Sequence, residues 1–474
     1  MDCTTVAVSR TVALAPWELF AVFGTSRGAG WLFGARCDEM RPGAAVSMRL
    51  PLDDRGGHTV EVLGRLGSVV PDAAIDIEHT QPWRGRIGLR FAPDGPRGTR
   101  VQVRARVPRA GVEWLLHRRG LPLPEPVDDG AVRLGAITTA SGPGAVYSMS
   151  AELMAELAVA EINADGGVGG RPVRLISADD GTEAARAADE ADRMVRLGCR
   201  AVFVNSTSDA FEAVRRRLDG RGVLVVHTVI NEGGGAGRTV VRFGERPGAQ
   251  LDALVAPAMA DGSRHWFLVG QDYVWSHGAH GAARRAVDRA GGQVVGEALA
   301  PLGTSDFGAV IERIRRSGAD LVLSSLVGAD EVAFERQSFA AGLRETTRTV
   351  SLVLEESTVA HIGPAAARGL RTALGYFQDA PTPGNADLQR RYRDAYGVWA
   401  PAVTALSETV YEAIHQYARV LHADPDSSAA LQARALRGSQ GGRRDVIGAR
   451  TLVRPRLYVA EVSDSGFAVV GETS

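Results

Sequence analysis

The sequence contains no lysine, and all 54 of its basic residues are arginines. This absence excludes the mechanisms that need a lysine side chain: Schiff-base chemistry, the phosphate-loop lysine and the kinase lysine. Arginine replaces lysine over most of a protein surface, because the two differ mainly at bidentate and stacked contacts. We interpret the missing lysine as a codon bias. The formal net charge is −1, so no overall field attracts nucleic acid or anionic lipid.

Cysteine and long apolar runs are also scarce. Cys3, Cys37 and Cys199 form no CxxC pair and no metal-ligand spacing, which is typical of a reducing compartment. No run approaches the ~20 apolar residues that a membrane helix needs. The first residues show no basic segment followed by an apolar one, as a signal peptide would. We therefore expect a cytoplasmic protein without membrane insertion; a periplasmic or extracellular location would require a start upstream of Met1.

A proline-rich segment divides the chain. Residues 118–130 read RRGLPLPEPVDDG, with three prolines close together followed by acidic residues and a glycine. This composition is typical of a stiff linker that pairs with nothing. We predict a first domain over 1–120, a linker over 121–130 and a second domain over 131–474, with few contacts across the linker.

The first domain reads as an α+β unit. Short β-rich runs broken by glycine, proline and aspartate predict several antiparallel strands, and Pro16 opens a helix that ends at Phe23. With the segments 15–20, 40–43 and 98–101, this order resembles the START-like helix-grip superfamily of polyketide cyclases and lipid carriers. The resemblance implies a sheet curved around the first helix. The family's closing helix is long, whereas here it is cut short at Gly120.

The second domain has a different order of predicted elements. Short apolar runs alternate with amphipathic segments of helical length, which predicts parallel sheets covered by helices on both faces. The segment is longer than one hydrophobic core usually supports, so we expect two sheets in two lobes.

Motifs for catalysis and metal binding lack their usual context. Gly24–Gly28 matches G-x-S-x-G around Ser26, but it follows a helix and not a strand. His277 and His280 have the spacing of two ligands on one helix, without a third. Neither glycine-rich segment, at 166–170 and 233–235, completes a nucleotide-binding fingerprint. We therefore expect no catalytic residue, no metal and no cofactor.

Polar and aromatic residues follow several predicted strands, where open parallel sheets bind ligands. Ser206, Thr207 and Ser208 lead into a helix, so they either cap it or bind a ligand carboxylate or amide together with free N–H groups. Tyr273 and Trp275 alternate at a strand end, and they are either core residues or the wall of a small-ligand site.

Residues 131–474 resemble the type I periplasmic-binding-protein fold, in its amide/urea and branched-chain amino acid branch. The resemblance implies a Venus flytrap, with lobe 1 over about 131–251 and 377–447 and lobe 2 over about 252–376 and 448–474. The residues that carry the match are 141–142, 161–168, 170–171, 269–274, 301–307, 332–334, 337, 342–343, 376–378 and 382–383.

The resemblance also implies the positions that contact the ligand. They are Ser206, Thr207, Ser208, His227 and Val229 in lobe 1, and Tyr273, Trp275, Gly328, Asp330 and Glu355 or Glu356 in lobe 2. Three positions depart from the family: Ser206 is usually aromatic, His227 is often tyrosine, and Ala329 replaces an acid, with Asp330 one place late. These departures weaken the assignment of urea itself and favour a changed ligand that is larger or more polar.

Three functions compete. The first is a cytoplasmic sensor that binds a small polar solute (an amide, a urea-like molecule or an amino acid) and reports closure through a protein partner or a homodimer. The second is the solute-binding component of an ABC importer. The third is a cyclase-like enzyme on the first domain, for which the acid/base candidates are His58, Glu61, Asp76 and His79.

Overall fold

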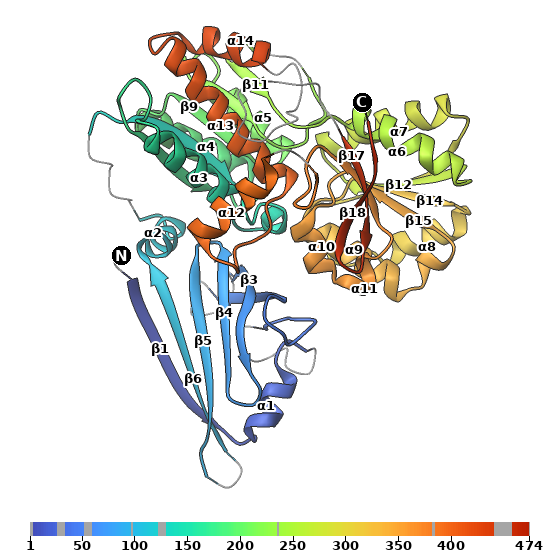
Figure 1. Cartoon of the computed structure of the whole chain (residues 1–474). Coiled ribbons are helices and arrows are strands. Elements are labelled where there is room, and N and C mark those ends of the chain that lie inside the picture. Colours follow the sequence, from blue (N-terminus) through green and yellow to red (C-terminus); the bar gives the residue numbers. More distant parts are fainter. Residues whose placement is uncertain are drawn as a thin grey trace.

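The chain folds around three separate β-sheets in a computed structural model (Figure 1). The structure describes residues 3–25, 34–51, 59–95, 98–121, 129–234, 237–381, 384–439 and 457–473. Among the features singled out above, Ser26, His58, most of the linker (122–128) and residues 382–383 lie outside these ranges.

The first domain is a six-stranded antiparallel sheet in the order β1-β6-β5-β4-β3-β2. Leu19 and Phe23, on and just after helix α1, are buried against apolar side chains of this sheet, such as Ile77 and Leu89. A helix therefore covers an antiparallel sheet, as the sequence predicts. The elements are β1 (Cys3–Val12), α1 (Pro16–Val22), β2 (Ala45–Pro51), β3 (Thr59–Val70), β4 (Ala74–Gln81), β5 (Gly85–Pro93), β6 (Thr99–Pro108) and α2 (Arg109–Arg118).

Lobe 1 contains a parallel sheet of five strands in the order β11-β10-β9-β7-β8. Its strands are β7 (Val132–Thr138), β8 (Val173–Asp179), β9 (Ala201–Asn205), β10 (Leu224–His227) and β11 (Val240–Arg242). Its helices are η2 (Pro143–Val146), α3 (Ala151–Ala164), α4 (Ala184–Arg196), α5 (Ser208–Arg217), α12 (Asn385–Tyr396), α13 (Ala405–Ala423) and α14 (Ala429–Ser439).

Lobe 2 contains a sheet of seven strands in the order β13-β12-β14-β15-β16-β17-β18, in which β17 runs antiparallel to both of its neighbours, β16 and β18. Its strands are β12 (His265–Gln271), β13 (Gln293–Ala300), β14 (Leu321–Ser324), β15 (Arg348–Ser351), β16 (Arg371–Leu374), β17 (Tyr458–Ser463) and β18 (Gly466–Glu472). Its helices are α6 (Pro247–Ala260), α7 (Val274–Arg289), α8 (Gly308–Ser317), α9 (Ala329–Ala340), η3 (Leu343–Glu345), α10 (Glu356–Ile362) and α11 (Pro364–Ala367).

The chain crosses between the lobes after β11 and again after β16. Helix α6 packs on α7 and β16, so it belongs to lobe 2 from Pro247 onward. The predicted boundary at residue 251 is therefore a few residues too late. The strand pattern was not decisive there, because β11 has only three residues.

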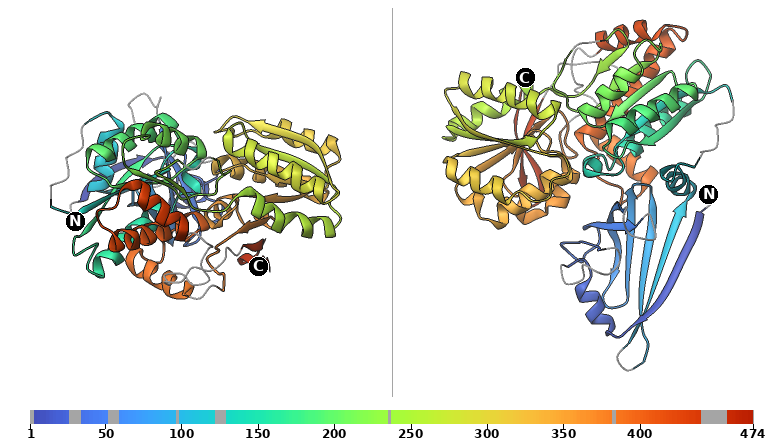
Figure 2. Two further views of the ribbon diagram at one scale, coloured as in Figure 1. Left: turned by 90° about the horizontal axis from the view of Figure 1, so that it is seen from above. Right: turned by 180° about the vertical axis from the view of Figure 1, so that it is seen from behind.

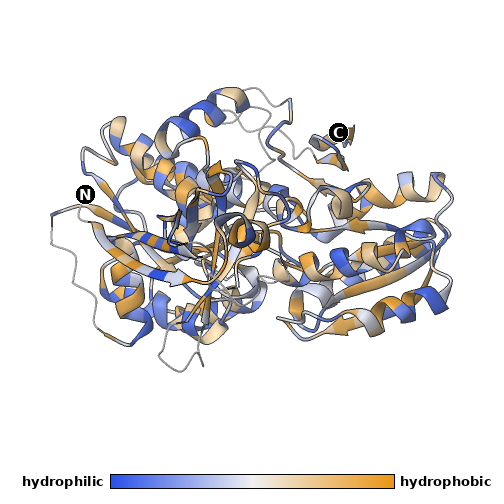
Figure 3. Cartoon of the chain, turned by 90° about the horizontal axis from the view of Figure 1, so that it is seen from below, coloured by the Kyte–Doolittle hydropathy of each residue, from blue (hydrophilic) through white to orange (hydrophobic). Residues whose placement is uncertain are grey.

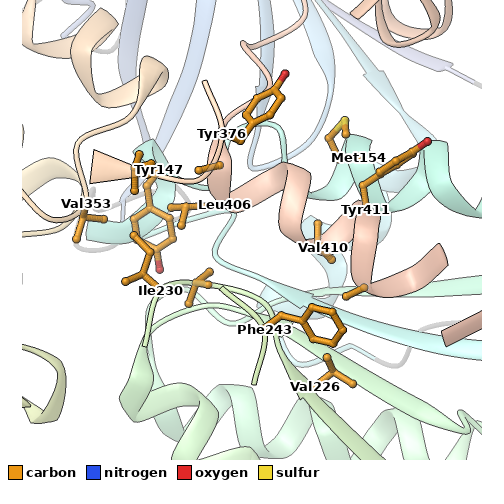
Figure 4. Close-up of a cluster of buried hydrophobic side chains, with 14 of the residues drawn as sticks. Tyr147, Met154, Val226, Ile230, Phe243, Val353, Tyr376, Leu406, Val410 and Tyr411 are labelled. Carbon is orange, nitrogen blue, oxygen red and sulfur yellow. The ribbon is translucent and has the colours of Figure 1, made fainter. Parts of the chain in front are cut away.

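Apolar side chains from both lobes meet in one large core cluster. Figure 4 shows Tyr147 beside Ile230 of lobe 1 and Val353 of lobe 2. Figure 3 shows that the strands of lobe 2 are mostly apolar, while the surrounding helices mix polar and apolar residues. Within the described residues, no helix has the length and apolarity to span a bilayer.

The first domain packs on both lobes, so the expectation of few contacts across the linker is wrong. Figures 1 and 2 show its sheet extending away from the lobes, with one end of β3 and β4 and helix α2 against them. Leu63 of β3 is buried in one cluster with Val146 and Met149 of lobe 1, and α9 of lobe 2 packs against that cluster. Asp38 pairs with Arg336 of α9. Proline in the linker restricts the linker itself and does not prevent surfaces far from it from packing.

Replacing Leu63 with alanine tests this packing. We expect Leu63→Ala to lower the free energy of unfolding by about 2–4 kcal/mol, because the side chain is buried and its removal leaves a cavity. Urea unfolding followed by circular dichroism measures the effect. Leu14→Ala is the control, since Leu14 is 42% exposed. An unchanged value for Leu63→Ala would show that the first domain does not dock here in solution.

Candidate functional site

Three loops of lobe 1 meet at the carboxyl ends of adjacent strands. Strands β7, β8 and β9 pair in register up to Thr138, Asp179 and Asn205, so the residues that follow them must gather. The Thr139 hydroxyl lies 2.8 Å from Ser206 Oγ and 3.1 Å from Asp180 Oδ1.

Ser206 and Tyr147 complete this network. Ser206 donates to Asp180, and the Tyr147 hydroxyl bonds with Thr139 and Ser206. Asp180 is fully buried, and burial raises the pKa of its carboxyl to about 7, assisted by the neighbouring charge of Asp179. Lobe 1 thus presents a rigid floor of linked hydroxyls over one buried acid.

The neighbouring Asp179 organises the backbone of the same loops. Its Oδ1 accepts hydrogen bonds from the backbone N–H groups of Ala140 (2.9 Å), Ser141 (3.0 Å) and Gly181 (2.9 Å). Its Oδ2 accepts from the Ser141 hydroxyl (2.6 Å) and from Trp114 Nε1 (2.9 Å) of α2. A single carboxylate therefore holds two cleft loops and ties them to the first domain.

The other predicted residues of lobe 1 divide into two groups. Thr207 caps α5 by accepting from Ala210 N, and the Ser208 hydroxyl donates to Glu232 at 2.6 Å. His227 stacks on Phe211 and bonds to the Ser206 carbonyl, and burial lowers its pKa to about 3.

Val229 is buried in the core cluster. Of the lobe 1 residues, Thr207 and Ser208 therefore lie at the helix end that faces lobe 2, whereas His227 and Val229 are packing residues behind it.

The two aromatic residues predicted in lobe 2 differ in their surroundings. Tyr273 is partly buried, and burial together with the charges of Asp209, Glu232 and Asp330 and the nearby Tyr147 raises the pKa of its hydroxyl well above its usual value. These neighbours come from both lobes. Trp275, in contrast, is 2% exposed, packs in the core cluster and donates to the Ser325 carbonyl, so it serves as a core residue.

The acidic residues predicted to contact the ligand in lobe 2 accept hydrogen bonds from backbone N–H groups of neighbouring loops and helices. Asp330 accepts from Gly303 N (2.9 Å) and Thr304 N (3.2 Å), and burial raises its pKa to about 6. Glu355 caps α10 through Ser357 N and Thr358 N, and burial raises its pKa to about 7.

Glu356 accepts from Gln378 N in the second crossover, and burial raises its pKa to about 8. The acids of lobe 2 therefore fix the loops that border the cleft.

The lobes meet at two glycines. A Cβ atom at Gly328 would lie 2.2 Å from the Pro143 carbonyl, and a Cβ atom at Gly278 would lie 2.6 Å from Glu232 Cβ. Each glycine lets a segment of one lobe approach the other more closely than any side chain would allow. The predicted position 328 is therefore a contact between the lobes.

The candidates for other chemistry are not brought together. His277 pairs with Asp272 and His280 with Glu297, and no group of three metal-ligating side chains occurs in the described residues.

In the first domain, Asp76 and His79 are three residues apart on β4, so they point to opposite faces. Both are buried: Asp76 pairs with two arginines of β5, and burial lowers the His79 pKa to about 4. Glu61 lies on the neighbouring strand β3.

Several residues of this site were not predicted: Thr139, Tyr147, Asp179, Asp180, Asp209 and Glu232. Asp179 and Asp180 come at the end of β8, so the rule that polar residues follow strand ends would have found them. Tyr147 and Glu232 lie further along their loops, and only the tertiary structure brings them to the cleft.

Comparisons with known proteins agree on residues beyond the linker. The family described as "Periplasmic binding protein" matches residues 131–463. The Leu/Ile/Val-binding protein BraC3 of Rhizobium johnstonii is 30% identical over 206 residues, which are 42% of this chain and 55% of that protein. Leu/Ile/Val-binding protein homolog 3 of Brucella melitensis is 26% identical over 218 residues, 45% of this chain and 59% of that protein. The chain thus spans less than two thirds of these relatives.

Solved structures share the fold. A solute-binding protein of an ABC transporter from R. palustris, in complex with 4-hydroxybenzoate, gives a TM-score of 0.64 at 20% identity, covering 73% of this chain and 97% of that one. A branched-chain amino acid transporter substrate-binding protein from Streptococcus pneumoniae, in complex with isoleucine, gives 0.61 at 17% identity, covering 72% and 98%. The expected two-lobed α/β fold with parallel sheets is confirmed.

One expectation is overturned by the same matches. The sequence led us to expect a cytoplasmic protein, but the family and its relatives are periplasmic binding proteins and ABC-transporter components. The cytoplasmic location is therefore wrong. It rested on the scarcity of cysteine, the lack of a long apolar run and the first residues of the chain, and none of these features carries information about the family to which the segment after the linker belongs.

Asp180 gives a pH-dependent prediction. Its pKa is raised from 3.8 to about 7 in the folded state, so its protonated form is favoured there. The stabilisation is complete below pH 3.8 and is lost as the pH rises through about 7. The side chain of the Asp180→Asn variant cannot ionise, so its stability lacks this pH dependence. As the pH rises from about 4 to about 7, we expect the free energy of unfolding of the wild type to fall by on the order of 2–4 kcal/mol relative to that of the variant.

Urea unfolding at several pH values measures this difference, with the exposed Asp219→Asn as control. A difference between wild type and Asp180→Asn that stays constant from pH 4 to pH 8 would contradict a raised pKa.

Proposed function

We propose, from the premise that the chain belongs to the periplasmic binding protein family, that it is the solute-binding component of an ABC importer and closes on one small polar molecule. The relatives named for Leu/Ile/Val binding and for ABC transport support this function over the sensor that the sequence had favoured. A permease is accordingly the protein partner we propose.

The observation that carries the proposal is the surroundings of the Tyr273 hydroxyl. The charges of Asp209 and Glu232 of lobe 1 and of Asp330 of lobe 2 all act on this hydroxyl, so its position is under the influence of acidic groups from both lobes. The N-terminus of α5, at Thr207 and Ser208, stands on the lobe 1 side. A helix N-terminus favours a carboxylate, and acidic groups favour an ammonium group.

A molecule with both groups satisfies this arrangement, and an amino acid is the simplest one. The relatives bound to isoleucine and to 4-hydroxybenzoate make a carboxylate the shared feature to test first. Neither the relatives nor the site suggests turnover, because the reported relatives are named as binding proteins and the site lacks a paired nucleophile and base.

For residues 1–120 we propose a START-like helix-grip unit. The support is the antiparallel sheet covered by α1 and followed by a terminal helix. That helix, α2, has ten residues, which is short for the family's lid. The acid/base candidates on opposite faces of β4 argue against the cyclase-like alternative.

A thermal-shift panel tests the main proposal. It contains leucine, isoleucine, valine, benzoate, 4-hydroxybenzoate, acetamide and urea. We expect at least one carboxylate to stabilise the wild type, since a ligand at about 100 times its Kd adds about 2.7 kcal/mol. Calorimetry with that compound should show affinity about 5–10-fold lower in Ser208→Ala and in Tyr273→Phe, the effect of one lost hydrogen bond.

Ser465→Ala, in the exposed turn between β17 and β18, is the matched control and should bind as the wild type does. Unchanged affinity in both cleft variants would place the ligand elsewhere, and no stabilisation by any compound of the panel would remove the proposed ligand class.

Closure has a separate test at Gly328. An alanine at this position would place its Cβ atom against the Pro143 carbonyl and so disfavour the closed state. We therefore expect Gly328→Ala to lower the affinity for the ligand found in the panel by at least roughly tenfold. Small-angle X-ray scattering should show a ligand-induced contraction in the wild type that the variant lacks. Gly318→Ala is the control, because Gly318 also has positive φ but nothing lies within 4 Å of its Cβ position. Equal contraction in Gly328→Ala would refute this contact as part of closure.

A further inference from the structure

A second cavity lies between the first domain and lobe 1, away from the cleft between the lobes. Its volume is about 840 Å³. Strands β4 and β5 with helix α2 form one side, and β7, β8 and α3 form the other. Figures 1 and 2 show α2 between the end of the sheet and the helices of lobe 1. The cavity is large enough for a molecule of drug-like size.

Two tryptophans form an aromatic wall. The rings of Trp83 and Trp114 lie with centroids 5.3 Å apart and planes tilted by 48°. Met149 and Leu153 line the cavity from lobe 1. Such a wall suits the flat or apolar body of a ligand, and the π-faces of tryptophan attract cations.

The cavity also contains hydrogen-bond acceptors without donors. Ser148 Oγ and Gln81 Oε1 belong to side chains that are 2% and 3% exposed, and neither atom has a hydrogen-bond partner among the described residues. Buried polar atoms in native proteins nearly always have partners. A ligand that donates hydrogen bonds would supply them.

An acidic pair lies beside these acceptors. Glu152 and Glu156 are one helical turn apart on α3 and both line the cavity. None of the ion pairs among the described residues includes Glu152. Burial and the charge of Glu156 raise the pKa of the Glu152 carboxyl to about 7. A cation placed here would compensate a carboxylate that the chain leaves without one.

Six arginines line the cavity (Arg84, Arg86, Arg106, Arg118, Arg186 and Arg193), and most of them have partners within the chain. Arg86 pairs with Asp76 and Glu78, Arg193 with Glu190, and Arg118 donates to the Ser141 hydroxyl at 2.7 Å. Arg84 lies over the Tyr396 ring. Arg186 pairs with Glu183, and the charge of Arg84 acts on Glu156. None of these arginines, all of them within the described residues, pairs with Glu152, so a ligand cation would supply the charge that this carboxylate lacks.

We propose that this cavity is a second ligand site, and that it takes an organic cation: a primary amine with an aromatic or aliphatic body. The body packs on Trp83 and Trp114, and the ammonium group donates to Glu152, Ser148 and Gln81. The site does not depend on the function proposed for the cleft.

The test uses phenethylamine as the probe on the full chain, with calorimetry as the measurement. 2-Phenylethanol and 3-phenylpropionate replace the ammonium group with a neutral and an anionic group. We expect phenethylamine to bind most tightly, and Glu152→Gln to weaken it by at least roughly tenfold, the scale of a lost charge-assisted hydrogen bond. Ala110 is an exposed residue of α2 that lines the cavity. Its replacement by tryptophan (Ala110→Trp) should fill the cavity with the larger side chain and also abolish binding.

Glu345→Gln in η3 and Tyr273→Phe in the cleft are the controls and should leave the affinity for phenethylamine unchanged. Circular dichroism establishes that each variant is folded. Preference for 3-phenylpropionate, equal affinity in wild type and Glu152→Gln, loss of affinity in Tyr273→Phe alone, or no heat at about 10 mM phenethylamine would each overturn the proposal.

Discussion

The carboxylate of Asp179 is the constraint on which the rest of the site depends. It accepts five hydrogen bonds: three from backbone N–H groups, one from the Ser141 hydroxyl and one from Trp114. Bonds to an ionised acceptor are stronger than neutral ones, so the loops after β7 and β8 have little freedom. This rigidity lets Asp180, directly beside it, hold Thr139 and Ser206 at the floor of the cleft.

The same carboxylate links the cavity at the first domain to the loops of the candidate site. Asp179 lines the cavity at the first domain and also fixes Ser141 at the edge of the cleft, and Arg118 of α2 reaches the same serine. A molecule that moved Trp114 would therefore act directly on the loop that borders the other site. No long pathway is needed, because one side chain is shared.

The three bodies of the protein also constrain one another sterically. Leu63 of the first domain lies in an apolar cluster to which both lobes contribute, and Asp38 pairs with Arg336 of lobe 2. Opening the lobes therefore has to change the surface on which the first domain rests.

The sequence alone determined the local parts of this structure. Apolar periodicity identified the strands and helices, and the residues after strand ends pointed to Thr207, Ser208 and Tyr273, because parallel strands bring their ends to one edge. It did not distinguish Trp275 from Tyr273, since alternation gives both the same side and burial depends on the neighbouring helices. It could not show that Tyr147 and Glu232 lie at the candidate site, or that Trp114 of α2 donates a hydrogen bond to Asp179. Those contacts join residues far apart in the chain, and only the docking of complete sheets and helices decides which of them meet.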